Sequence, residues 1–521
     1  MTRPADATPP PRDRAAWRAA LAITAGAALV RLAFAAFLPL IPDEMYYWDW
    51  SRHLSAGYFD HPPMIALLIR AGTALLGIVG AGHTPLAVRF APVLAGAGAA
   101  LATAGIARRL AGDAAARTAA LVLAVMPLVA GGLVLATPDA PLLAASAATL
   151  YGVVRAVQSP SRSTAALRWW AAAGVALGLA FASKYTSILL PVALAIAALV
   201  RPSLRARLRE AGPWVACLLA TLVFLPVLQW NATHDWISFR FQLQHGLGTP
   251  ARGSPLRREL DLLGGQLALV SPVVFALLAA AVWRTLRHRT DDARFALAIV
   301  ATVSWAFFVY SALRKSVEAN WPAPSYVPAV ALLAGRLPSP RAVARWLRRG
   351  VLLSAALSGV ALALIAWAVT APTLPRALAH AAARIGREMA SWRPAATTLE
   401  TAGLSAGPHR WIAADRYQDV AALAYALPDQ PAATCLCLSG RRNQYALWPG
   451  FARRAAPGDT LVAVLDDSPE TPAVVTRLAG LFETVARGPL APLLRGRDTV
   501  GVRRLWVLGR YRGGWPPRVT P

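Results

Sequence analysis

The sequence is poor in charged residues, and poorest in acidic residues and lysine. Charged residues make up 15% of the 521 positions, whereas a soluble globular domain usually carries about 25%. Of the 53 basic residues, which face only 26 acidic ones, Lys184 and Lys315 alone are lysines. Hydrophobic residues account for 56% of the chain, a level typical of a protein with many membrane-spanning helices. The composition excludes an ordinary soluble enzyme.

Cysteine is also scarce. Three cysteines are too few for a disulfide scaffold, and the chain lacks the CxxC pairs that bind zinc or carry out thioredoxin chemistry. In a soluble protein the net charge of +27 would indicate nucleic acid as a partner. Here the arginines stand in short clusters between long apolar runs, as the positive-inside rule requires of a multi-pass membrane protein. We therefore expect membrane lipids, and no nucleic acid, as partners.

Eleven apolar runs approach the length of about 20 residues that is needed to cross a bilayer. They are 16–40, 86–107, 115–136, 140–158, 169–183, 184–200, 211–229, 262–285, 295–313, 322–336 and 351–371. The first run is too long for a signal peptide, so we interpret it as a retained anchor. The predicted organisation is a cytoplasmic tail over 1–15, a transmembrane domain over 16–371 and a further domain over 372–521.

The arginines assign sides to these runs. Every second loop is rich in arginine, which places those loops in the cytoplasm if the N-terminus is inside. They lie within 108–117, 155–168, 201–209, 284–294 and 336–349. The apolar segment 62–80 would break the alternation if it crossed the membrane, so we predict that it lies along the outer surface as part of a first outer loop over 41–85.

The odd number of runs places the C-terminus outside the cytoplasm. Four short strand-like stretches alternate there with helical patterns such as Tyr417–Leu427. The stretches are Trp411–Ala414, Thr434–Leu438, Thr460–Leu465 and Gly501–Leu508. The predicted fold class is a mainly α membrane protein, a multi-helix transmembrane bundle with a C-terminal extracytoplasmic α/β domain.

The unusual polar residues gather in five segments that all lie on the predicted outer side. These are 41–63, 136–141, 182–186, 229–236 and 313–324, and they include both lysines. Carboxylates beside cations suit group transfer to a hydroxyl, because a carboxylate can take the hydroxyl proton while cations hold a phosphate leaving group. No nucleotide pool exists on this side, so the activated group would arrive attached to a lipid.

Each candidate also has a purely structural explanation. Asp43 could cap an interfacial helix running to about Gly57, with Glu44 in its first turn, and Asp139 could cap a membrane helix. His61 could be a surface histidine, and both lysines could be snorkelling anchors. An aromatic belt could account for Trp48, Trp50, Trp230, Trp236 and Trp321. Together these explanations require several ionisable groups to collect by chance at one membrane face, where they are costly and usually functional.

Five strings in this order resemble the family 39 glycosyltransferases, the bacterial branch related to protein O-mannosyltransferases and the lipid A aminoarabinose transferase. The strings are Asp43-Glu44, Tyr58–Pro63, Thr137–Ala140, Ser183–Tyr185 and Asn320–Pro324. The resemblance spans residues 15 to about 335 and implies the GT-C membrane fold. Two later strings, Asp415–Gln418 and Gly440–Tyr445, resemble the C-terminal region of some bacterial members less specifically.

This resemblance implies an enzyme that transfers a hexose or pentose, with inversion, from a polyprenyl-phosphate donor. The acceptor would be a hydroxyl of lipid A, a core or other glycan, or a protein, on the outer side of the bacterial inner membrane. The family's general base falls on Asp43, with Glu44 beside it, and its second-loop aspartate matches Asp139. Both aspartates could share a divalent cation such as Mg²⁺ or Mn²⁺, and we expect no other cofactor.

The donor-binding residues depart from the family pattern at one position. The aminoarabinose branch has a lysine before the proline pair, where this chain has His61. A histidine of ordinary pKa is largely neutral at pH 7, so phosphate binding would also depend on Lys184, Arg314 and Lys315. This difference argues against aminoarabinose as the sugar. The remaining residues that we predict to line the substrate cavity are Tyr46, Asp60, Tyr185, Glu318, Asn320 and Trp321.

Other functions remain open from the sequence. A transporter or lipid flippase would also have many helices, but such proteins usually place their charges near the bilayer midplane, often in repeated halves. This chain collects its charges at one face and shows no repeat. A ligase with a lipid-diphosphate donor would lack the motif match. The C-terminal domain could act as a binding module.

Overall fold

The computed structural model describes residues 13–248, 253–288, 291–335, 341–371, 373, 386–438, 441–469 and 471–515. It divides into two compact units, which we call the bundle unit (Met1–Ala36 with Ser55–Leu362) and the C-terminal unit (Phe37–Leu54 with Ala363–Pro521). Three arginines of the predicted topology, Arg12, Arg289 and Arg336, lie outside the described residues, as does Gly440.

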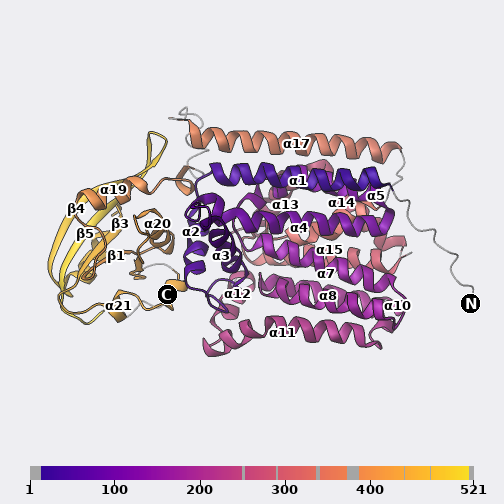
Figure 1. Ribbon diagram of the computed structural model, residues 1–521, viewed down its shortest axis with the longest axis horizontal. Helices are drawn as coiled ribbons and strands as arrows, with labels where there is room; N and C mark the ends of the chain where they lie inside the picture. Colours follow the sequence, from indigo (N-terminus) through magenta and orange to yellow (C-terminus); the bar gives the residue numbers. More distant parts are fainter. Residues whose placement is uncertain are drawn as a thin grey trace, which may run out of the picture. The chain divides into compact units, whose positions relative to one another are not determined.

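The bundle unit is almost entirely helical, and its longest helices run roughly parallel (Figure 1). Its first half comprises α1 (Arg14–Phe37), α3 (Met64–Gly77), α4 (Pro85–Ala111), α5 (Asp113–Val125), α6 (Pro127–Ala130), η1 (Gly132–Val134), α7 (Asp139–Gln158) and α8 (Thr164–Phe181). Its second half comprises η2 (Tyr185–Ile188), α9 (Leu189–Val200), α10 (Pro202–Arg207), α11 (Ala211–Thr233), α12 (Ile237–Leu247), α13 (Pro255–Val270), α14 (Pro272–His288), α15 (Asp292–Arg314), α16 (Ala323–Ala334) and α17 (Arg341–Thr370). Side-chain oxygens of Thr84, Ser163 and Asp291 accept backbone N–H groups and begin α4, α8 and α15.

In the described part of the chain, 7 helices are long and apolar enough to cross a membrane: α1, α4, α7, α8, α11, α15 and α17. Two further predicted runs form helix pairs that pass the same test only together, α5 with α6 and η1, and α13 with α14. The last two runs, 184–200 and 322–336, are shorter apolar helices. All of the predicted runs are therefore helical, and up to 9 of them qualify as spans.

The two helix pairs are bent, by 71° after α5 and by 102° after α13. Pro127 follows the first break and Pro272 the second. Proline has no N–H to donate and its ring clashes with the preceding turn, and Ser271 beside Pro272 adopts a left-handed φ of 72°. The runs 115–136 and 262–285, predicted as continuous spans, are thus broken helices.

Helix α3 has 14 residues and is among the shorter apolar helices. A helix of this length rises about 21 Å, which is less than the hydrocarbon thickness of about 30 Å. Its length agrees with the prediction that 62–80 does not cross, while the side on which it lies stays a prediction.

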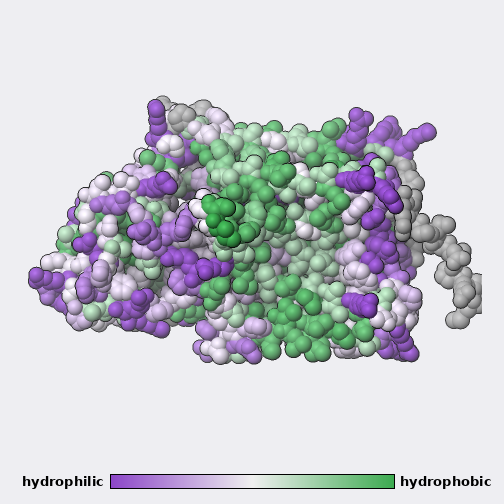
Figure 2. All heavy atoms as spheres, in the orientation of Figure 1, coloured by the Kyte–Doolittle hydropathy of each residue, from purple (hydrophilic) through white to green (hydrophobic). Residues whose placement is uncertain are grey.

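Helices α4, α7, α8 and α11 pack against one another in this order, and the buried core of the bundle unit draws most of its residues from α4, α5, α7, α15 and α16. Gly174 on α8 permits a close approach to α11, because a Cβ there would meet the carbonyl oxygen of Ala216 on α11 at 2.4 Å. Helix α7 is central, with 72% of its apolar stretch buried, whereas only 17% is buried in α17. The face of the bundle unit seen in Figure 2 is a broad hydrophobic band, with hydrophilic residues at the end of the unit that carries α10. Such a surface fits a lipid environment.

The C-terminal unit combines a five-stranded sheet with short helices (Figure 1). Its elements are α2 (Pro42–Arg52), α19 (Arg393–Thr401), β1 (Arg410–Ala414), α20 (Tyr417–Ala426), β2 (Thr434–Cys435), η3 (Gln444–Ala446), α21 (Phe451–Arg454), β3 (Thr460–Asp466), α22 (Thr471–Ala479), β4 (Phe482–Arg495) and β5 (Asp498–Tyr511). The strand order is β2-β1-β3-β5-β4, in which β1 is parallel to β2 and β3, and β5 is antiparallel to β3 and β4. The central register sets Ile412 and Val507 on either side of Val462.

The predicted strands around 411–414, 460–465 and 501–508 and the helix over 417–427 are present. The stretch 434–438 is a strand only at its first two residues, and β4 was not predicted. Strand β4 contains Gly488, Pro489 and Pro492 and exposes much of its length, so it lacks the regular alternation typical of a strand. The predicted fold class, a helical membrane protein with a C-terminal α/β domain, is confirmed.

Helix α2 belongs to the C-terminal unit although it precedes most of the bundle in sequence. Its rings pack against α20, with Trp48 at 5.0 Å from Tyr425 and Tyr46 at 4.6 Å from Tyr417. It ends at Arg52, short of the predicted end near Gly57. The grouping of α2 with residues more than 300 positions later was not predicted from the sequence.

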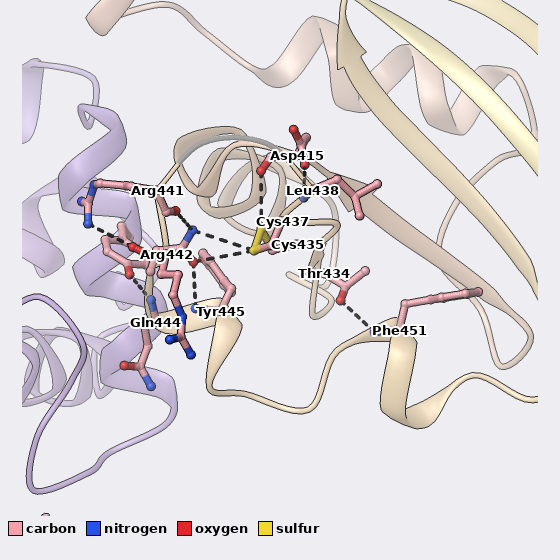
Figure 3. The surroundings of a disulfide bond; sticks show 12 residues. Asp415, Thr434, Cys435, Cys437, Leu438, Arg441, Arg442, Gln444, Tyr445 and Phe451 are labelled. Carbon is pink, nitrogen blue, oxygen red and sulfur yellow. Dashed lines mark hydrogen bonds between the residues drawn. A yellow bond between two sulfur atoms is a disulfide. The ribbon is translucent and has the colours of Figure 1, made fainter. Parts of the chain in front are cut away.

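Cys435 and Cys437 form a disulfide in the turn after β2 (Figure 3), and Cys217 on α11 is free and exposed. Three cysteines are too few for a scaffold of disulfides, and this single bridge was not predicted from their spacing. Disulfides persist in oxidising compartments such as the bacterial periplasm, so the bridge agrees with an extracytoplasmic C-terminal unit.

We expect the disulfide to stabilise the C-terminal unit modestly. Replacing both Cys435 and Cys437 by Ser should lower its free energy of unfolding by about 1–2 kcal/mol, because chain-entropy arguments assign a small effect to so short a loop. Thermal unfolding in detergent measures the effect, with Cys217→Ser as the control that leaves it unchanged. Thiol counting of the denatured, unreduced protein should find the thiol of Cys217 alone; three reactive thiols would show that the bridge does not form.

Candidate functional site

Three of the strings singled out in the sequence meet in the bundle unit around Asp139. Lys184 Nζ lies 2.7 Å from Oδ1 of Asp139 in an ion pair, and Asn320 Nδ2 donates to Oδ2 at 2.5 Å. The indole of Trp321 lies 6.0 Å from Lys184 Nζ. We call these four residues the Asp139 cluster.

Helix ends bring the cluster together. Asp139 is the first residue of α7, Lys184 immediately precedes η2, and Asn320 and Trp321 lie in the turn before α16. Helices α7 and α16 pack directly against each other. Side chains from segments about 180 positions apart therefore converge where these helices begin.

The Asp139 carboxylate is engaged at both oxygens and is only 8% exposed. It does not cap α7 through its side chain. Lys184 is 9% exposed, too buried for a snorkelling anchor whose charged end would reach water. A buried charge pair with a further hydrogen bond is the arrangement in which an ionised lysine is tolerated away from water. Asp139 is thus better placed to hold a cation than to abstract a proton.

A second group of cations surrounds the C-terminal ends of α12 and α15. Lys315 Nζ donates to the carbonyl of Gln244 at 2.6 Å, and Arg314 donates to the carbonyl of Gly248 at 3.4 Å. Arg258 on α13 donates to the carbonyls of Ala312 and Leu313 at 3.0 and 2.7 Å. Cations are favoured at helix C-termini because the helix dipole is negative there. Lys315 and Arg314 therefore contribute to the fold, whatever they bind in addition.

The predicted residues Asp60, His61 and Tyr185 lie in the bundle unit, and Asp60 and Tyr185 contact α12. Asp60 is buried and its carbonyl accepts a hydrogen bond from Gln242 at 2.5 Å. His61 is half-buried in the turn before α3.

Tyr185 donates to Ser238 Oγ at 2.9 Å and accepts from Asn231 at 3.3 Å. Glu318 is exposed, and its carbonyl accepts the N–H of Trp321 at 3.0 Å.

The two acidic residues at the start of α2 have different surroundings. Asp43 is exposed, and its Oδ1 accepts a hydrogen bond from the hydroxyl of Tyr417 at 3.2 Å. Glu44 is fully buried, and its Oε2 accepts the backbone N–H of Ile41 at 3.1 Å. Ile41 is the N-cap position, so Glu44 rather than Asp43 satisfies the helix N-terminus. Of the two, only Asp43 presents a carboxylate that a substrate could reach.

The aromatic residues of α2 are buried. Tyr46, predicted to line the substrate cavity, is 2% exposed, and its hydroxyl accepts the backbone N–H of Gln444 at 2.6 Å; its place in the substrate cavity stays a prediction. Trp48 and Trp50 are buried as well and are not part of an aromatic belt. Their rings pack inside the C-terminal unit, where Trp50 lies 4.8 Å from Tyr46, because burying aromatic surface there removes it from water.

A second acidic residue of α2 is buried against the same segment. Tyr445 donates to Oδ2 of Asp49 at 2.8 Å. Burial raises the pKa of Asp49, although Arg52, Tyr445 and His53 act in the opposite direction. The pKa of Tyr445 is raised well above its usual value by burial and by the Asp49 carboxylate. This hydrogen bond holds α2 to the later segment.

The predicted site residues therefore form two groups. Asp139, Lys184, Asn320 and Trp321 contact one another in the bundle unit, while Asp43 and Glu44 belong to the C-terminal unit. Among the described residues, no group of three or more His, Cys, Asp or Glu side chains is arranged to hold a metal ion. A divalent cation between Asp43 and Asp139 remains a prediction.

Sequence reasoning missed the residues that contact α2 from the C-terminal unit. Tyr417 lies in the string Asp415–Gln418, and Gln444 and Tyr445 lie in the string Gly440–Tyr445. Both strings stood out as weak resemblances, which was the available signal. Their contacts with α2 show that both strings help to hold this helix, which their spacing in the sequence does not reveal.

Comparisons with known proteins identify the family of the chain. The family model described as Dolichyl-phosphate-mannose-protein mannosyltransferase matches residues 60–230, a stretch that includes Asp139 and Lys184. The chain is 30% identical to the lipid A galacturonosyltransferase RgtD of Rhizobium johnstonii over 390 residues. This alignment covers 74% of this chain and 77% of the relative.

Two solved structures of ArnT from Cupriavidus metallidurans share the fold. The apo structure has a TM-score of 0.65 at 18% identity and covers 94% of this chain and 98% of that chain. The structure bound to undecaprenyl phosphate has a TM-score of 0.64 at 19% identity and covers 95% and 98%. The expected GT-C fold is confirmed over nearly the whole chain. RgtD is a relative over about three-quarters of both sequences. The chain therefore belongs to the family of membrane glycosyltransferases that includes RgtD, and not to the transporters or lipid flippases.

Proposed function

We propose that this protein transfers galacturonic acid, or a closely similar hexuronic acid, from a polyprenyl-phosphate carrier to a hydroxyl of lipid A or its core glycan. The observation that carries the proposal is the 30% identity to the lipid A galacturonosyltransferase RgtD over most of both chains. The lipid carrier is supported by ArnT, whose fold this chain shares and which binds undecaprenyl phosphate.

The proposed reaction is a single displacement with inversion at the anomeric carbon. The Asp43 carboxylate removes the proton of the acceptor hydroxyl as its oxygen attacks that carbon. The bond between the sugar and the phosphate breaks, and its electron pair leaves with the polyprenyl phosphate. Asp43 suits the role of base because it is exposed at the first turn of α2, whereas Glu44 is occupied with the backbone of Ile41.

Cations of the bundle unit stabilise the negative charge that develops on the leaving phosphate. Lys184 has a buried, oriented ammonium beside Asp139 and Trp321. A fixed cation in a partly dry site stabilises developing negative charge better than one in water. His61, Arg314 and Lys315 are further candidates for binding the phosphate. Basic residues around the site would also bind an anionic sugar favourably.

Purified protein with defined donors tests the proposal. We expect transfer from polyprenyl-phosphate galacturonic acid to lipid A, and a deletion strain whose lipid A lacks the corresponding sugar by mass spectrometry. Transfer from aminoarabinose phospholipid but not from the galacturonic acid donor would contradict the proposed sugar. Lipid A of unchanged mass in the deletion strain would contradict the proposed acceptor.

We also propose that the transfer takes place on the extracytoplasmic side of the inner membrane. The arginine pattern and the Cys435–Cys437 bridge both support this orientation. Reporter fusions at Gly82 and Gly407 should both report the extracytoplasmic side, and a fusion at Ser161, in an arginine-rich loop, should report the cytoplasm. Opposite sides at Gly82 and Gly407 would overturn the orientation.

A further inference from the structure

The helix that carries the proposed base is held by the C-terminal part of the chain. Two hydrogen bonds reach α2 from the segment that follows the disulfide, one from the N–H of Gln444 to the Tyr46 hydroxyl and one from the Tyr445 hydroxyl to Asp49. Their lengths are 2.6 and 2.8 Å. Both acceptors are buried, so these bonds fix the helix in one orientation.

One residue of the C-terminal part of the chain also contacts the proposed base directly. Tyr417 is the first residue of α20, and its hydroxyl donates to Oδ1 of Asp43 at 3.2 Å. A hydrogen bond to one oxygen orients a carboxylate and favours its charged form. A general base must be both ionised and correctly directed before it can accept a proton.

The ring of Tyr417 is held by two neighbours. The Tyr46 ring centroid lies 4.6 Å away, and the guanidinium of Arg441 lies 4.8 Å from the ring centroid. A cation over the ring attracts its electrons, which makes the phenolic hydroxyl a stronger donor. Two charged groups lie near this hydrogen bond: Arg441 over the Tyr417 ring, and Glu44 next to Asp43 in α2.

The segment that contains the disulfide contacts the residues just before α20 (Figure 3). Asp415, two residues before Tyr417, accepts the N–H of Leu438 through its carboxylate at 2.7 Å. The Sγ of Cys435 lies 3.5 Å from the carbonyl oxygen of Asp415. The backbone that presents Tyr417 is thereby held by the residues around the disulfide.

We propose that Tyr417 is a positioning residue for Asp43, through which the C-terminal part of the chain takes part in catalysis. The inference rests on the proposed role of Asp43 as the general base. It assigns residues after the membrane bundle a task beyond binding or packing, because the Tyr417 hydroxyl orients the carboxylate and favours its charged form.

Tyr417→Phe tests the inference, because phenylalanine keeps the ring between Tyr46 and Arg441 and removes only the hydroxyl. We expect kcat to fall about 10- to 100-fold, the range for losing a hydrogen bond to a charged group, with the KM for the donor unchanged. The acidic limb of the kcat–pH profile should move to higher pH, since the charged carboxylate loses a stabilising partner. Tyr425→Phe is the matched control, because Tyr425 lies on the same helix and packs on Trp48; its kcat and profile should stay as in the wild type.

A double substitution separates this inference from the role of Asp43. In an Asp43→Asn background, Tyr417→Phe should cause no further loss. A wild-type kcat and pH profile in Tyr417→Phe overturns the inference while leaving Asp43 as the base. A lower kcat with an unshifted profile and a lower melting temperature also overturns it, since only packing would then be lost. Near-normal turnover by Asp43→Asn alone overturns the base assignment itself.

Discussion

Asp43→Asn is expected to leave a folded, membrane-inserted protein with kcat lowered about 10²- to 10⁴-fold, the usual contribution of a general base. Asparagine has nearly the same shape and can still accept the hydrogen bond from Tyr417. Its amide cannot accept the proton of the acceptor hydroxyl, so the chemical step loses its base. Sugar transfer from a polyprenyl-phosphate donor, at matched levels of purified protein, measures the effect.

Glu44→Gln provides the informative comparison. The glutamine carbonyl can still accept the backbone N–H of Ile41, so α2 should remain intact. We expect a much smaller loss of activity than in Asp43→Asn, because Glu44 is buried and occupied at the helix N-terminus. The reverse ranking, with Glu44→Gln nearly inactive and Asp43→Asn active, would transfer the role of base to Glu44.

The sequence predicted the membrane bundle and most of the candidate site for one physical reason. Ionisable residues are costly at a membrane face, so Asp139 and Lys184 stand out in a chain this apolar, and resemblance adds Asn320 and Trp321. What could not be predicted is that these residues contact one another. Their contacts depend on how α7 packs against α16 and on where the segment before η2 lies, which no local pattern in the sequence encodes.

The features that the sequence did not predict have the same origin. Tyr46 lies in a polar outer loop, and its partners Tyr417 and Gln444 come from a region about 400 positions later. Helical periodicity gave no sign of the breaks at Pro127 and Pro272, because apolar composition continues through both bends. In each case a long-range contact or a local proline overrides the pattern that the prediction used.

Lys184→Ala is expected to lower transfer about 10²- to 10³-fold, the usual loss when one fixed group that stabilises transition-state charge is removed. Lys184→Arg should also lower activity substantially, because a planar guanidinium does not fit where a compact ammonium lies 2.7 Å from Asp139 and beneath the Trp321 indole. Lys315→Arg should have a milder effect, because Arg314 lies beside it and the new side chain can still donate to the carbonyl of Gln244.

The ion pair requires one further variant, since removing Lys184 alone leaves the buried Asp139 carboxylate without its cation. Breaking such a pair typically costs about 3–5 kcal/mol of stability, which by itself would lower activity. Lys184→Met combined with Asp139→Asn removes both charges and keeps the volume, so the double variant should fold. If it regains activity, Lys184 serves only to neutralise Asp139. We expect it to fold and remain inactive, because the leaving phosphate would still lack the cation that receives its charge.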